Sequence, residues 1–167
     1  ETLTIDSGTL LGAQNVTVNG GYVGGTGIIN MSGGTFLIDG NGGFSPSTNP
    51  WTFYNLTFGD GIGAEEITTG GGAAITITNV LTVATNQTLT NESVSITLSG
   101  SGTPFVRAGT YTTDNSLSVT YTSGSGVTAL TSASVTFGHL IINGAGTFNV
   151  NGNVLVSNTL IVSGGTL

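Results

Sequence analysis

The chain carries very little charge. Of its 167 residues only one is Lys or Arg, eight are acidic, and the formal net charge is −7. Charged residues make up 5% of the sequence, against about 25% in an average soluble domain. A chain with one cation cannot neutralise a row of phosphates, so we do not expect nucleic acid as a partner. The 37% of hydrophobic residues still supply a core, which a disordered chain lacks.

Cysteine is absent and histidine occurs once, as His139. The chain therefore has no disulfide, no thiolate ligand and no histidine cluster for a transition metal. We interpret His139 as a structural or solvent-facing residue at a corner. With Arg107 as the one cation available to stabilise an anionic transition state, we do not expect an enzyme. No run reaches the roughly 20 apolar residues of a membrane span, so we expect no membrane insertion in this segment.

Alternation of apolar and small polar residues runs through the whole chain. It is seen in Thr2–Ile5, Ile75–Ile77, Val94–Leu98 and Leu117–Tyr121, where Thr or Ser fills the second position. A period of two predicts strands with one buried face, and Thr favours such a pleated surface. Gly, Asn and Ser clusters separate the runs and predict turns. No window has helical periodicity, so we predict an all-β fold.

Within the all-β class, a parallel β-solenoid is favoured over a β-sandwich or jelly-roll filament subunit. The apolar parity changes inside one segment, from Val135 and Phe137 to Leu140 and Ile142, with Gly138 between them. Such a change predicts a corner where a strand bends into the next face of a coil. At roughly 20 residues per coil, the chain would form about eight coils. Three segments, 40–50, 59–74 and 100–114, are predicted to leave the coil as loops.

Short phrases recur at long spacing. The phrase at residues 1–10, ETLTIDSGTL, is echoed at 158–167 by NTLIVSGGTL, and QTL occurs at 87–89. A looser echo relates residues 52–58 to 136–142. The matched ends suggest a window from a longer periodic protein. We therefore divide the single segment 1–167 into approximate copies 1–85 and 86–157, with the start of a third at 158–167.

The phrases TFYNLTF, NVLTVATNQTL and FNVNGNVLVSNTLIVSGGTL resemble repeat regions of large bacterial and archaeal surface proteins. These include autotransporter passengers and filamentous-haemagglutinin-like adhesins. The resemblance implies a β-helical, extracellular or cell-surface segment of a filament, stalk or sheath, whose partners are copies of itself or adjacent repeats. The alternative it implies is an adhesin that binds surface glycans. The three predicted loops depart from the even spacing of such repeats.

Few residues are candidates for chemistry. Asp60, Glu65 and Glu66 place three carboxylates in one short loop, which is either a solvated turn or a candidate calcium site. We expect no other cofactor. Exposed aromatic side chains can stack on sugars, and Trp51 and Tyr54 are the candidate glycan contacts. Alternation places Tyr54, Leu56 and Phe58 on one face, and Trp51 and Phe53 on the other, with at least one of these faces in the core.

Two further sets of residues follow from the pattern. Sequons mark five candidate N-glycosylation sites, at Asn15, Asn30, Asn55, Asn86 and Asn91. Because an uncovered strand edge invites pairing, we expect assembly edges at the two ends of the chain, at Leu3, Ile5, Leu160, Ile161 and Val162. The sequence thus predicts a non-enzymatic extracellular structural protein that assembles end to end by strand stacking.

Overall fold

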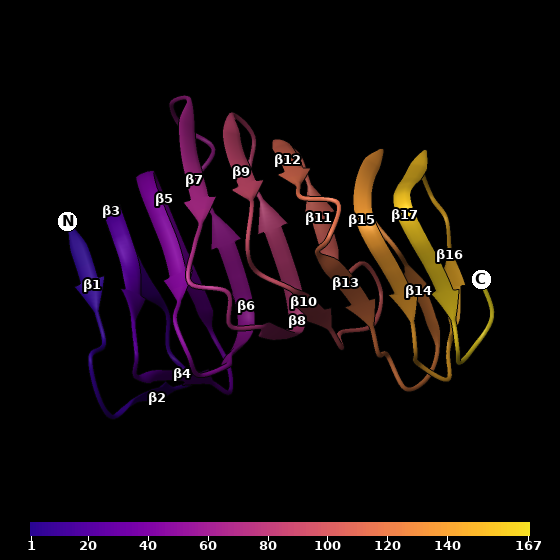
Figure 1. Ribbon diagram of the computed structural model, residues 1–167, viewed down its shortest axis with the longest axis horizontal. Helices are drawn as coiled ribbons and strands as arrows, with labels where there is room; N and C mark the ends of the chain where they lie inside the picture. Colours follow the sequence, from indigo (N-terminus) through magenta and orange to yellow (C-terminus); the bar gives the residue numbers. More distant parts are fainter.

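The computed structural model describes residues 1–167, and all its regular elements are strands. Every paired strand runs parallel to its neighbour, and the chain winds into stacked coils with its two ends at opposite ends of a rod (Figure 1). This confirms the parallel β-solenoid. The strands are β1 (Thr2–Thr4), β2 (Thr9–Gly12), β3 (Val16–Gly25), β4 (Ile28–Met31), β5 (Thr35–Pro46), β6 (Trp51–Phe58), β7 (Glu65–Thr69), β8 (Ile75–Val83), β9 (Gln87–Asn91), β10 (Ile96–Leu98), β11 (Phe105–Arg107), β12 (Thr110–Thr113), β13 (Ser118–Tyr121), β14 (Val127–Ala129), β15 (Val135–Ile142), β16 (Thr147–Asn149) and β17 (Val154–Val162).

The coil has three faces, which the chain visits in a fixed order. The first face contains β1, β7, β9, β12 and residues 22–25, 42–46, 135–137 and 154–156 of the longer strands. The second contains β2, β4, β10, β13 and residues 51–53, 75–77, 139–142 and 159–162. The third contains β11, β14, β16 and residues 16–19, 35–39, 55–58 and 80–83. Long strands therefore turn a corner and serve two faces.

The second face shows the number of coils. Its inward positions lie in one ladder of eight levels, which are Leu10, Ile29, Trp51, Ile75, Ile96, Val119, Leu140 and Leu160. Successive levels of this face are as close as 19 residues, from Leu10 to Ile29, and as far apart as 24, from Trp51 to Ile75. The predicted eight coils of roughly 20 residues are confirmed, and the uneven spacing reflects longer corners.

Corners inside strands are where apolar parity changes. In β15 the pairing shifts between Phe137 and His139, and both Phe137 and Leu140 are buried, as predicted. In β6 the same shift occurs between Phe53 and Asn55. The sequence-based assignment of Trp51 and Phe53 to one side and Leu56 and Phe58 to the other was wrong. All four are buried, because the chain turns at Tyr54, the residue of this group that faces outward.

The three segments predicted to leave the coil belong to it. Segment 40–50 contains the second half of β5, segment 59–74 contains β7, and segment 100–114 contains β11 and β12. The glycines of these segments are explained by close contact between the backbones of neighbouring coils, and not by a loop conformation. A Cβ built at Gly42 would lie 1.3 Å from the carbonyl oxygen of Gly21 in the coil below. Gly-rich composition is therefore compatible with stacked strands when backbones approach this closely.

One apolar core of 30 buried residues fills the rod. Aromatic rings pack edge to face within it, both between neighbouring coils, as in Phe36 and Phe53 at a centroid distance of 5.3 Å, and within one coil, as in Phe44 and Trp51 at 5.5 Å. Asparagines stack at a corner, where Asn79 Nδ2 donates to Asn55 Oδ1 at 2.8 Å. Backbone ladders thus hold the coils together along the rod, and side-chain ladders fill them.

The long-period echoes do not follow the coils. Leu3 pairs with Val23 on the first face, whereas Leu160 pairs with Leu140 on the second face, so the two matching phrases lie on different faces. The structural repeat is the single coil. The division into copies 1–85, 86–157 and 158–167 stays a prediction about the sequence.

Candidate functional site

The three candidate calcium ligands make separate hydrogen bonds. Asp60 Oδ1 accepts a hydrogen bond from the backbone N–H of Ile62 at 2.6 Å, within its own turn. Glu65 Oε2 accepts one from the N–H of Gly40 at 2.8 Å, and Glu66 Oε1 accepts one from Thr90 Oγ1 at 3.0 Å. No group of three acidic or histidine side chains is gathered anywhere in residues 1–167. The structure therefore does not bring these three carboxylates together.

The aromatic candidates for glycan contact are separated by burial. Trp51 has no exposed surface, and its Nε1 donates to the carbonyl of Gly27 at 2.9 Å. It therefore belongs to the core and cannot stack on a sugar at the surface. Tyr54 is 37% exposed and stands alone, because Phe53 and Phe58 are buried. The predicted aromatic platform is absent.

The sequons differ in accessibility. Asn15, Asn30 and Asn86 are exposed, and Asn55 is half-buried beside Asn79. Asn91 is 1% exposed, so glycosylation of the folded chain at Asn91 is excluded.

Asn91 instead organises a buried polar network. Its Oδ1 accepts from Thr69 Oγ1 at 2.8 Å and from the N–H of Val94 at 3.2 Å. Its Nδ2 donates to the carbonyl of Val94 at 2.9 Å and to the Tyr111 hydroxyl at 3.3 Å. Burial raises the pKa of the Tyr111 phenol, an effect that the bond from Asn91 opposes. The network fixes the corner between the first and second faces. The sequence analysis did not predict this network, although Asn91 lies two residues after the buried Leu89 and therefore faces inward.

His139 and Asp114 lie at neighbouring corners. His139 is half-buried, and its Nε2 lies 3.2 Å from Asn158 Nδ2. Asp114 is exposed, and the side chain and backbone N–H of Ser116 hold the pKa of its carboxyl below the usual value. Both residues close turns between coils. The hydrogen-bond partners of their side chains, Asn158 and Ser116, do not titrate, so these contacts do not suggest proton transfer.

Arg107 occupies a position that is apolar in the preceding coils. On the third face it follows the inward residues Val18, Ile38, Phe58 and Val83 in one ladder. Its Nη1 donates to the carbonyl of Gly109 at 2.8 Å, while its Nε is buried without a partner. The lone cation of the chain thus emerges from the edge of the core. Arg107 lies two residues after the buried Phe105, and this spacing already predicts that its side chain starts on the inward side of the strand.

The two ends of the rod leave core positions uncovered. At the last coil Leu160 and Val162 are 48% and 47% exposed, although Leu140 and Ile142, which precede them in the ladder, are buried. Ile161 is 43% exposed on the outer side of the same strand. At the first coil Leu3 and Ile5 are half-buried and pack against the core. The predicted edge residues therefore lie at the two open ends.

The fold defines the class of protein as a three-faced parallel β-solenoid with one apolar core. It contains no helix that could cross a membrane. No family model, curated protein or solved structure matches the chain.

Proposed function

We propose that the chain is a non-enzymatic structural segment or subunit of an extracellular, cell-surface filament, stalk or sheath. It assembles end to end, with the first coil of one unit stacking on the last coil of the next. The next unit is a second copy of this chain or an adjacent repeat. The observation that carries the proposal is the exposure of Leu160 and Val162, whose equivalents one coil below are buried.

The edge strands support the same proposal. β1 pairs with β3 alone, and the last strand, β17, pairs with β15 alone, so each has an unpaired edge that points along the rod axis. An unpaired edge offers backbone N–H and C=O groups to another strand. Covering Leu160 and Val162 from their half-exposed state would stabilise the contact by about 1 kcal/mol each. Apolar contacts and a backbone ladder would then continue across the junction.

Composition and resemblance support the remaining parts of the proposal. The chain has one histidine, one cation and no cysteine, which leaves few groups for catalysis. The resemblance to repeat regions of surface adhesins supports an extracellular location. A surface that carries Thr, Asn and Gly instead of charges also suits repeated stacking, because few like charges meet at a junction.

Sedimentation analysis over a range of protein concentrations tests the proposal. We expect the isolated chain to associate with rising concentration, and Leu160→Lys to stay monomeric because it places a charge in the junction. Ile62→Lys is the matched control, since Ile62 is 76% exposed in a loop away from both ends. A monomeric wild type at high concentration contradicts the proposal, as does equal dissociation by both variants.

A further inference from the structure

The backbone ladder of the first face is interrupted at one level. Neighbouring strands on this face pair from β1 to β12, and pairing begins again between β15 and β17. No ladder joins β12 to residues 135–137 of β15. The second face is continuous at the same level, through β13 and β15. Figure 1 shows the resulting separation between β12 and β15.

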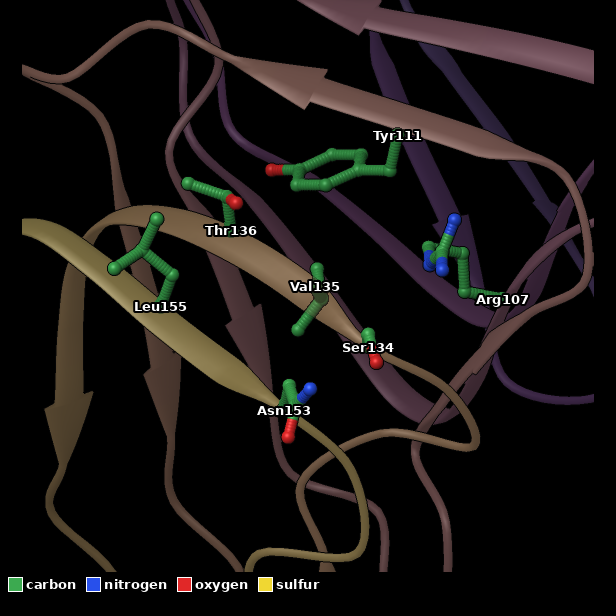
Figure 2. Close-up of a pocket in the computed structure, with 7 residues that line it drawn as sticks. All are labelled: Arg107, Tyr111, Ser134, Val135, Thr136, Asn153 and Leu155. Atoms are coloured by element: carbon green, nitrogen blue, oxygen red, sulfur yellow. The ribbon is translucent and has the colours of Figure 1, made fainter.

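A cavity of about 310 Å³ lies in this interruption. Figure 2 shows Tyr111 on one side, from β12, and Val135 and Thr136 on the other, from β15, with Arg107 at one end. The volume is at the lower limit for small-molecule sites in proteins, and it suits one sugar-sized group. The cavity is therefore a consequence of two strands that diverge where the ladder is missing.

The guanidinium of Arg107 has donors to spare at this cavity. It donates one hydrogen bond, to Gly109, out of five N–H groups. Its Nε is buried without a partner, so the Nη groups are the donors that a ligand could reach. No acidic residue lines the cavity. A partly buried cation without a counter-charge is unfavourable, and an anion with two acceptor oxygens would compensate it in bidentate geometry. A carboxylate is one such anion.

The remaining lining has two kinds of surface. Ser134, Thr136 and Asn153 offer hydroxyl and amide groups, while Leu155, which is 61% exposed, offers apolar surface beside the buried Tyr111 and Val135. The Tyr111 ring is fixed, because it is 7% exposed and its hydroxyl accepts the bond from Asn91. Polar groups beside an apolar wall are what a sugar ring needs, since it carries hydroxyls on its rim and C–H groups on its faces.

We propose that this cavity binds the carboxylate-bearing sugar unit of an acidic saccharide. Arg107 pairs with the carboxylate, the polar lining residues bond the sugar hydroxyls, and the ring lies against the exposed side chain of Leu155. The site opens on the first face, at the side of the rod, with Asn153 and Leu155 contributed by the last coil. The proposal does not rest on end-to-end assembly. It also replaces the contact predicted at Trp51, which is buried.

Calorimetric titration of the full chain with galacturonic acid tests the proposal. For a ligand of this size we expect a dissociation constant on the order of 1 mM. The uncharged methyl ester of the same sugar, and the variant Arg107→Gln, should each weaken binding by about tenfold or more, because a charge-assisted bond is lost. Arg107→Lys should lose less, since it keeps the charge. A trimer of galacturonic acid that binds more tightly than the monomer would identify a polysaccharide chain as the source, and equal affinity a free sugar acid.

Backbone amide NMR locates the ligand and provides the control. Shifts are expected at Tyr111, Ser134 and Thr136, and Tyr54→Ala, which removes the exposed aromatic residue elsewhere, should leave the affinity unchanged. The proposal is overturned by the absence of saturable binding up to about 10 mM, by equal affinity for acid and methyl ester, or by shifts centred on Tyr54. Equal affinity for an acidic peptide would overturn the assignment to a saccharide. If Arg107→Gln does not fold, as judged by circular dichroism, the comparison of acid and ester decides alone.

Discussion

The polar network around Asn91 permits a quantitative prediction for the variant Asn91→Leu. The side chain is 1% exposed and makes four hydrogen bonds, with Thr69, Tyr111 and both backbone groups of Val94. Leucine has a similar volume and makes none of them. At about 1 kcal/mol of net stability per bond, the expected loss is about 4 kcal/mol. Leaving the Val94 N–H buried without a partner keeps the cost near this value even if the core repacks.

Equilibrium unfolding in urea measures the loss, and the same substitution at Asn30 provides the control. Asn30 is exposed on the second face, so Asn30→Leu should change the free energy of unfolding by less than about 0.5 kcal/mol. Hydrogen exchange gives a local readout, because the Val94 N–H donates to Asn91 itself. We expect its protection to fall strongly in Asn91→Leu. A loss below about 1 kcal/mol, or an unchanged exchange rate at Val94, would refute the reasoning.

Two further predictions concern pH and backbone conformation. Burial raises the pKa of Tyr111, and more strongly that of Tyr121, above the ordinary value of about 10. Above pH 10 the unfolded chain therefore loses protons that the folded chain keeps, and the free energy of unfolding should fall by about 1.4 kcal/mol per pH unit for each phenol. In urea titrations at several pH values Tyr121→Phe should make this fall shallower. An unchanged slope in Tyr121→Phe would contradict the prediction. Gly71 has a φ of 79°, and a Cβ there would lie 2.3 Å from the carbonyl oxygen of Pro46, so Gly71→Ala should lower stability by at least about 2 kcal/mol. In melting experiments Gly124→Ala should behave like wild type, because nothing lies within 4 Å of its built Cβ, and equal effects of the two changes would be inconsistent with this account.

The sequence predicted the fold class because alternation is a local signal. Strands such as β8 and β13 follow directly from it, and so does the corner in β15, where Gly138 coincides with the change of parity. The corner in β6 was missed because Tyr54 and Asn55 turn without a glycine to mark the place. The alternation of inward and outward residues was therefore extended through this corner, although the corner reverses it.

Glycine-rich strands and the cavity at Arg107 depend on contacts between coils. Gly42 is needed because the backbone of Gly21 lies directly against it. From composition alone the glycines around Gly42 predict a loop. The cavity exists because β12 and β15 do not pair, and no local pattern states which coil a strand will lie against. The sequence therefore predicts strands and inward residues better than the places where stacking is imperfect.

The interruption between β12 and β15 also has a mechanical consequence. A rod joined by ladders on all three faces resists bending in every direction, since each bend must stretch backbone hydrogen bonds. At this level the first face has no such bonds and the third face has no ladder between β11 and β14, only an isolated bridge between Gly102 and Thr128, while the second face stays continuous through β13 and β15. The rod is therefore least stiff here, and it bends most easily by opening or closing the first face, with the second face as the hinge line. A ligand seated between the two strands would act as a wedge and make this joint rigid.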